Sequence, residues 1–134
     1  MKGRTRAVSK EKYVIYMKRS SEFQSIAETA MDKGFWDVAV ANAVHAGISM
    51  ADALAVYYLG LRSAAQEHGE SIQLLYRIGV DRKELERNTK HLTDLLDVKS
   101  LAEYEERSLK SDDAEVAVKK SKRFRVWATA KLPR

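Results

Sequence analysis

The feature that most constrains the fold is the 25-residue run 35–59, which has the composition and spacing of one long helix. Its larger side chains recur every three or four residues, which places them on one side of an α-helix. Alanines and Gly47 fill much of the remainder, so neighbouring helix backbones can approach closely. The run therefore predicts a central helix enclosed by other helices, with Trp36 and Leu54 in the core. Its main apolar side carries Trp36, Val40, Ala43, Val44, Gly47, Ala51, Leu54 and Tyr58.

The rest of the chain predicts an all-α fold in one domain. A chain of 134 residues can bury a sizeable core unaided, and without cysteine it has neither disulfides nor cysteine zinc sites. Residues 1–8 are expected to be a disordered basic leader and residues 9–134 a single helical domain. Because no secretory segment and no long uninterrupted apolar run is found, we expect a cytoplasmic protein without membrane contact, metal or cofactor.

Capping residues and glycines predict the helix boundaries. A first helix is expected at 9–33, ending at Gly34, so that it forms an antiparallel hairpin with the central helix, which ends at Gly60. A polar connection at 61–70 precedes a short helix at 72–78. Asp81 is the expected N-cap of the next helix, which weakens near 99–100. A hydroxyl cap at Ser111, followed by two aspartates, predicts a last helix at 112–131 that packs through Val116, Phe124, Trp127 and Ala128.

Charge is concentrated at the two ends of the chain. Residues 1–20 carry seven Lys and Arg side chains against one Glu, and residues 116–134 carry seven against no acid. Basic ends of this kind either attract nucleic acid or lie as solvated segments against an acidic surface, and both readings stay open. The candidate nucleic-acid-binding residues are Arg87, Lys99, Lys119, Lys120 and Arg123.

A polar stripe runs along one side of the central helix. His45, Ser49 and Asp52 are spaced at i, i+4 and i+7, and Asn42 extends the stripe towards the N-terminus. Such a stripe faces solvent, a cleft or another subunit. Arg87 and His91 are also one turn apart, where they could bind a phosphate and transfer a proton, or simply form an exposed charged face.

Several segments together resemble the HEPN superfamily of small helical bundles. The resemblance rests on Gly-Phe-Trp-Asp at 34–37, Asn-Ala-Val-His-Ala-Gly-Ile at 42–48, Ala-Asp-Ala-Leu at 51–54, the histidine at 68, and Leu-Leu-Asp-Val-Lys-Ser-Leu-Ala-Glu-Tyr at 95–104, with Ala117 and Phe124 in the final helix. It covers about 20–132. It implies an antiparallel four- to five-helix bundle that forms a homodimer. Many members are RNA-cutting toxins paired with a minimal nucleotidyltransferase antitoxin, and others are catalytically silent.

The family's ribonuclease motif is altered in this chain. The subgroup pattern Arg-Asn-x-Ala-Asp-Tyr maps onto 99–104, so Lys99 replaces the arginine and Tyr104 stands where active members have histidine. Lysine lacks the bidentate fork of arginine, and tyrosine is a poor general base at neutral pH. The resemblance therefore implies a dimeric module that binds nucleic acid or protein, part of or derived from a toxin–antitoxin system, without efficient nuclease activity.

The alternative is an active, metal-independent ribonuclease toxin that uses Lys99, Tyr104 and His45, paired with a minimal nucleotidyltransferase antitoxin. Both readings place a homodimer contact at the central helix, with Asn42, His45, Ser49 and Asp52 at its polar edge. A two-fold axis beside this helix would bring two copies of Lys99 and Tyr104 into one cleft.

Overall fold

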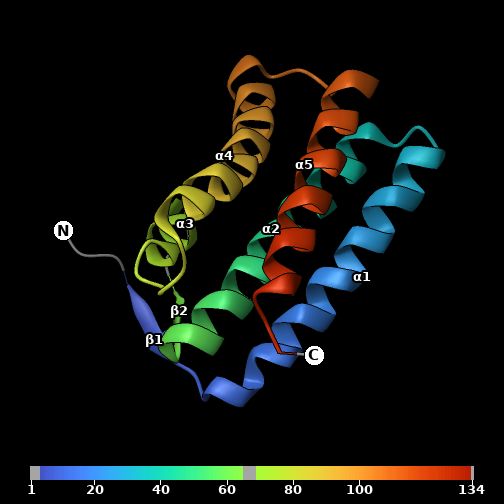
Figure 1. Cartoon of the computed structure of the whole chain (residues 1–134). Coiled ribbons are helices and arrows are strands. Elements are labelled where there is room, and N and C mark those ends of the chain that lie inside the picture. The colour runs from blue at the N-terminus through green and yellow to red at the C-terminus, as the bar shows by residue number, and fades with distance from the viewer. Residues whose placement is uncertain (1–3, 65–68, 134) are drawn as a thin grey trace.

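The computed structural model describes residues 4–64 and 69–133, with the backbone alone described at 101–104. The chain is 77% helical and folds as five helices packed antiparallel, a small helical bundle, which confirms the predicted fold class. Figure 1 shows α5 lying in front of α2, with α4 and α1 on opposite sides. In chain order the elements are β1 (Thr5–Ala7), a 3-10 turn η1 (Lys10–Lys12), α1 (Tyr13–Asp32), α2 (Trp36–Leu59), β2 (Leu61–Ser63), α3 (Gly69–Leu75), α4 (Arg82–Glu105) and α5 (Ser111–Ala130).

Two glycines set the ends of the α1–α2 hairpin. Gly34 and Gly60 both adopt positive φ, +74° and +65°, a region that side chains with a Cβ rarely occupy. At the first turn the backbone N–H of Phe35 donates to the carbonyl oxygen of Ala30, which satisfies an open helix end. The predicted hairpin and both of its glycine stops are therefore confirmed.

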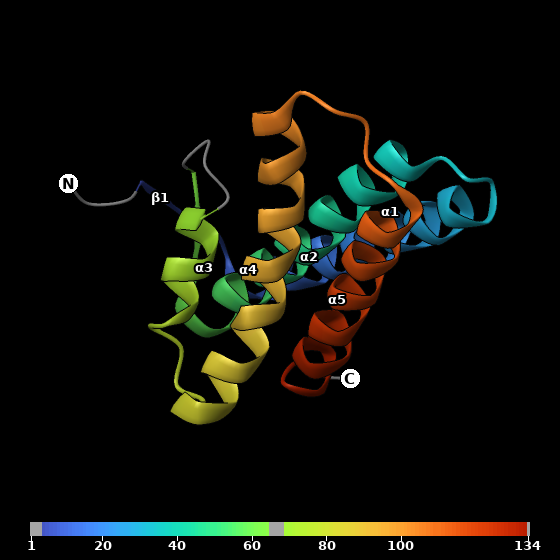
Figure 2. The ribbon, with the colours of Figure 1, turned by 90° about the horizontal axis from the view of Figure 1, so that it is seen from above.

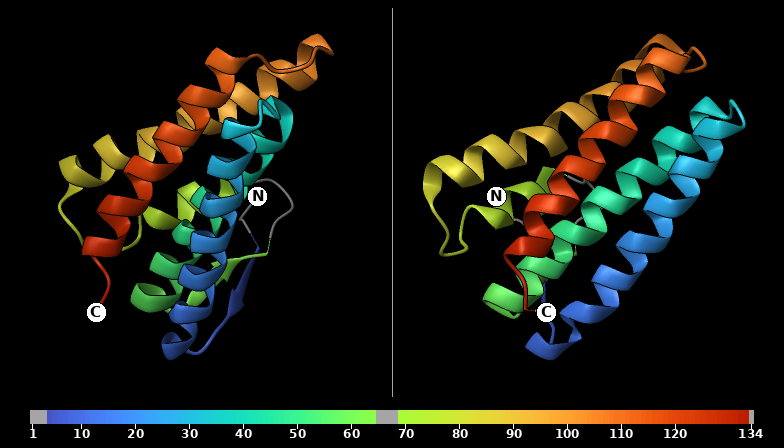
Figure 3. Two further views of the ribbon diagram at one scale, coloured as in Figure 1. Left: turned by 90° about the vertical axis from the view of Figure 1, so that its right-hand side faces the viewer. Right: turned by 45° about the vertical axis from the view of Figure 1, so that its right-hand side comes forward.

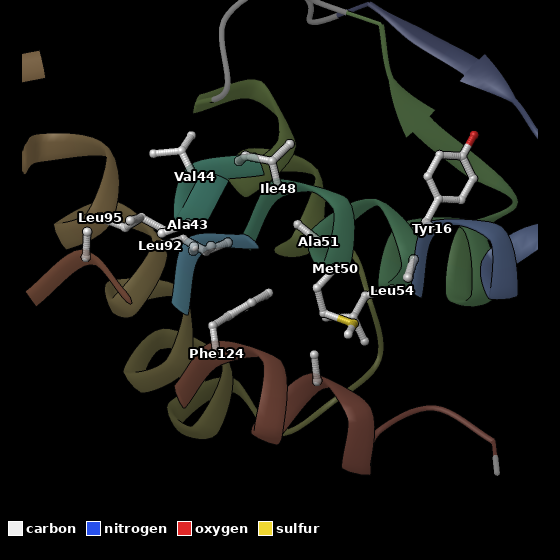
Figure 4. Packing of buried hydrophobic residues seen from close by; sticks show 14 of the residues in the cluster. Tyr16, Ala43, Val44, Ile48, Met50, Ala51, Leu54, Leu92, Leu95 and Phe124 are labelled. Carbon is white, nitrogen blue, oxygen red and sulfur yellow. The ribbon is translucent and has the colours of Figure 1, made fainter. Parts of the chain in front are cut away.

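The core is built around α2 (Figure 4), whose side chains meet Phe124 of α5 and Leu92 and Leu95 of α4. Leu54 is fully buried, as expected. Trp36 is only partly buried and packs against the edge of the core, because it stands in the first turn of α2. The expectation that Trp36 is a core residue is thus only partly correct.

Close approach of α4 to α2 depends on Gly47. A Cβ at this position would lie 2.7 Å from Cδ2 of Leu92 and 3.1 Å from Cδ2 of Leu95, both closer than ordinary contact. With glycine at this position the two leucines fill the space against the α2 backbone, and a Cβ would force their methyl groups to shift.

One side of α2 is left uncovered by the bundle. Helices α1 and α4 both contact α2 but, within the described residues, not each other, and α5 covers the opposite side. Figures 2 and 3 show this arrangement from above and from the side. The uncovered strip, called here the open α2 face, carries Val38, Ala41, Asn42, His45 and Ser49, which are half-buried or exposed.

The expected disordered leader is wrong for residues 5–7. They form β1, which pairs antiparallel with β2 in the register Thr5–Ser63, Arg6–Arg62 and Ala7–Leu61. The backbone N–H of Val8 donates to the carbonyl oxygen of Gly60, so the ribbon starts where α2 ends. Strands of three residues are too short for an alternating pattern, and their partner is more than fifty residues away, so periodicity could not reveal them.

The remaining boundaries follow the capping residues, with local corrections. Asp81 caps α4 as expected, since its carboxylate accepts a hydrogen bond from the backbone N–H of Glu84 at 2.9 Å. Helix α4 continues through 99–100 without the expected weakening, and α3 begins three residues before 72. The N-cap of α5 is Lys110 instead of Ser111, because the Asp113 carboxylate accepts from the Lys110 N–H at 2.8 Å.

Val116 of α5 is exposed rather than packed against the bundle, and its neighbour Ala117 is buried in its place.

By length and composition α2 could cross a membrane, but 72% of its most apolar window is buried inside the protein, as in the core helix of a soluble bundle.

Candidate nucleic-acid interface

Two ion-pair networks set the register between the antiparallel helices α4 and α5. At one end Glu84 accepts from the Trp127 indole N–H at 2.6 Å and pairs with Lys131 at 2.5 Å. Ten residues further along α4, Asp94 pairs with Lys120 at 3.2 Å. These contacts hold Glu84 opposite the C-terminal end of α5, and the bonds from Lys131 and Trp127 lower the pKa of the Glu84 carboxyl group. The pKa of the Asp94 carboxyl group is lowered by its bonds to Lys90 and Lys120.

Between the two networks lies a cavity of about 490 Å³, called here the α4–α5 groove. Three cationic side chains and two apolar ones come from α5, at positions that recur every three or four residues and so share one side of the helix. Helix α4 supplies an amide and an imidazole. The lining residues are Asn88, His91, Lys119, Lys122, Arg123, Val126 and Trp127.

The cations of the groove are not neutralised by the protein. Among the described residues, Lys119, Lys122 and Arg123 make no ion pair, and all three are exposed. Lys120 differs, because its ammonium group is paired with Asp94. An anion entering the groove would therefore meet three available positive charges without breaking an existing pair.

His91 lies on the α4 side of the groove as a neutral acceptor or donor. Burial lowers its pKa, and the nearby Lys120 and Arg123 lower it further, against the opposing effect of Asp94. Its Nδ1 atom is buried and has no hydrogen-bond partner among the described residues. The half-buried Trp127 ring packs on Phe124, with centroids 5.7 Å apart, and is held by its bond to Glu84.

The structure divides the sequence-predicted nucleic-acid residues between two places. Lys119 and Arg123 line the groove, with the paired Lys120 beside it. Arg87 is exposed on α4, one turn before His91, so the predicted Arg87–His91 pair borders the same groove. Lys99 instead lines a separate cavity of about 390 Å³ with Asp37, Val40, Ala41, Glu106, Arg107 and Leu109.

Two residues that line the groove, Lys122 and Trp127, are not among the candidates from the sequence. The apolar side chain of Trp127 predicts a place in the core. Lys122 carries the same charge as its neighbours, and only its spacing from Lys119 and Val126 separates it from the other basic residues of α5.

On the other side of the bundle, the predicted catalytic candidates meet only in part. His45 is exposed on α2, and its pKa is lowered by partial burial and by the positive charge of Lys99. Its ring lies beside that of Phe23, with centroids 5.1 Å apart. The side chain of Tyr104 lies outside the described residues, as does His68, so the pairing of Lys99 with Tyr104 stays a prediction.

The expected polar edge of the dimer contact is also divided. Asn42 is half-buried and donates to the carbonyl oxygen of Val38, while Ser49 is half-buried on the same face. Asp52 is only 7% exposed, so its carboxyl group belongs to the interior.

The fold and the groove together define a small antiparallel helical bundle with a basic, aromatic-edged surface. No family model, no curated protein and no solved structure matches the chain. Within the described ranges, no three His, Asp or Glu side chains gather as a metal site would require.

Proposed function

We propose that the protein is a homodimeric, HEPN-like helical module that binds RNA through the α4–α5 groove and does not cut it efficiently. The observation that carries the proposal is the set of three unpaired cations, Lys119, Lys122 and Arg123, around one cavity. Phosphate groups supply the matching charge, and an exposed nucleobase can pack against Val126 and Trp127. The resemblance to HEPN proteins supports a role in, or descent from, a toxin–antitoxin system with a minimal nucleotidyltransferase partner.

Single-stranded RNA suits the groove better than a duplex. The cavity combines cations with apolar surface, and single strands offer both phosphates and unstacked bases. A-form duplexes present mainly phosphates and 2′-hydroxyl groups, which do not need an apolar surface.

Fluorescence anisotropy with labelled single-stranded RNA tests this proposal. The double variant Lys122→Gln/Arg123→Gln should weaken binding about tenfold or more, and the slope of log K against log salt should become shallower by about 1.4. The matched control, Lys18→Gln/Lys33→Gln, removes two exposed charges on α1 and its C-cap and should keep the wild-type affinity. Equal losses in both double variants would show that the groove has no special role.

The ribonuclease alternative is favoured by one observation, the proximity of Lys99 to His45. With its pKa lowered, the His45 imidazole is neutral near pH 7 and can accept a proton from a 2′-hydroxyl, while Lys99 supplies positive charge for the phosphate. Incubation of RNA with the protein in EDTA distinguishes the two readings. Cleavage that disappears in both Lys99→Ala and His45→Ala would replace the binding proposal with this one.

A further inference from the structure

A second cationic cluster lies away from the α4–α5 groove, where the β1–β2 ribbon meets α1 and α2. In the ribbon register Arg6 stands directly opposite Arg62, which puts two like charges on one face of a two-stranded sheet. Like charges in this position are normally unfavourable. Among the described residues neither arginine has an ion pair within 4 Å, so the repulsion is not relieved by a salt bridge.

Helix α1 adds a third guanidinium group. The central carbon of Arg19 lies 5.4 Å from the ring centroid of Tyr16, and that of Arg62 lies 5.5 Å from the same centroid. Figure 4 shows Tyr16 between the helices and the ribbon. Because Tyr16 is buried, its ring fixes where both guanidinium groups can lie.

Among the described residues, Asp52 is an acidic group beside this cluster, and burial hinders its ionisation. Asp52 of α2 feels the charges of Arg62 and Arg19, but burial dominates and raises its pKa to about 6. The Nε atom of Arg62 is buried without a hydrogen-bond partner in the part of the chain that the structure describes. Arg62 and Arg19 thus act on the same buried carboxyl group, and Arg62 keeps an unused donor.

We infer that Arg6, Arg19 and Arg62 form a binding site for a terminal phosphate group, that is, a phosphate monoester or inorganic phosphate. Guanidinium groups bind phosphate oxygens through paired N–H donors. Three arginines and one ionised aspartate leave an excess of about two positive charges. This excess matches the charge of about −1.5 to −2 on a terminal phosphate, whereas an internal phosphodiester carries less negative charge. The site does not depend on the α4–α5 groove.

Isothermal titration calorimetry of the full chain with inorganic phosphate at pH 8 and low salt tests the site. We expect saturable one-to-one binding per chain, weakened about tenfold by Arg19→Gln and by Arg6→Gln. Both side chains are exposed, so these variants should keep the wild-type helix content by circular dichroism. Lys18→Gln, next to Arg19 in sequence, is the matched control and should bind phosphate as the wild type does.

A further variant distinguishes specific binding at the arginine cluster from nonspecific attraction by the protein's net positive charge. Asp52→Asn removes the internal carboxylate and should tighten phosphate binding severalfold at pH 8, where Asp52 is ionised. The groove variant Lys122→Gln/Arg123→Gln should leave phosphate binding unchanged. Absence of saturable binding, or equal binding by wild type, Arg19→Gln and Arg6→Gln, would overturn the inference.

RNA oligonucleotides of one sequence, with either a 5′-phosphate or a 5′-hydroxyl, identify the source of the phosphate. Tighter binding of the 5′-phosphorylated form, lost in Arg19→Gln, would support the site and assign it to RNA ends. Binding of inorganic phosphate with no preference between the two oligonucleotides would support the site and assign it to small phosphate compounds.

Discussion

At the scale of single residues, Asp52 ties stability to pH. Its pKa rises from 3.8 to about 6 on burial, so the folded protein holds this proton more tightly than the unfolded chain does. The contribution of Asp52 to the free energy of unfolding therefore falls as pH rises from about 4 to about 6, and it stays low at higher pH.

Asp52→Asn should remove this dependence. The difference in free energy of unfolding between the variant and the wild type should grow from pH 4 to pH 7 in favour of the variant, by at most about 3 kcal/mol. Urea unfolding at pH 4, 5, 6 and 8 measures it. A difference that stays constant across this range would mean that Asp52 titrates normally in the folded state.

At the scale of elements, α2 carries most of the core, and Leu54 tests that assignment. Leu54→Ala removes a fully buried side chain and should lower the free energy of unfolding by about 2–5 kcal/mol. Val126→Ala on α5, where the side chain is 66% exposed, should change it by less than about 0.5 kcal/mol. Similar small effects in the two variants, compared by urea unfolding, would contradict the central position of α2.

The β1–β2 ribbon gives a second test at this scale. Deleting residues 1–8 removes β1 and the Val8–Gly60 hydrogen bond, so it should lower the free energy of unfolding by about 2 kcal/mol, as expected for losing a few backbone hydrogen bonds. Differential scanning calorimetry measures the change. An unchanged melting temperature would favour the disordered leader expected from the sequence.

At the scale of the whole molecule, we expect a second copy of the chain to bind at the open α2 face. Val38 is 46% exposed there, near Asn42, and Ile26 of α1 is 52% exposed. We expect sedimentation equilibrium at micromolar concentration to give about twice the chain mass of 15.2 kDa.

Placing a charge on this face should disrupt the dimer. Val38→Asp would bury an unpaired carboxylate at the contact and should shift the equilibrium towards the monomer. Val116→Asp is the matched control, since Val116 is similarly exposed, at 41%, on α5, which covers the opposite side of α2. A monomeric wild type, or equal behaviour of the two variants, would exclude a dimer through the open α2 face.

The sequence by itself determined the helices, because their causes are local. Gly34 and Gly60 end helices through positive φ, Asp81 caps α4, and the small and apolar residues of 35–59 require a central position. It also indicated that basic residues of α5 could bind an anion, because charge is visible in composition.

The tertiary structure alone decided which of these side chains share a surface. Lys119, Arg123 and His91 meet because ion pairs at Glu84 and Asp94 fix the register of α4 against α5, and no spacing along the chain encodes that register. Arg6 meets Arg62 through a ribbon between distant segments. Helical periodicity places Asp52 in a polar stripe that faces solvent, a cleft or another subunit, but Asp52 is buried and its carboxyl group feels the charges of Arg62 and Arg19 from other segments. Contacts between distant segments override a local pattern.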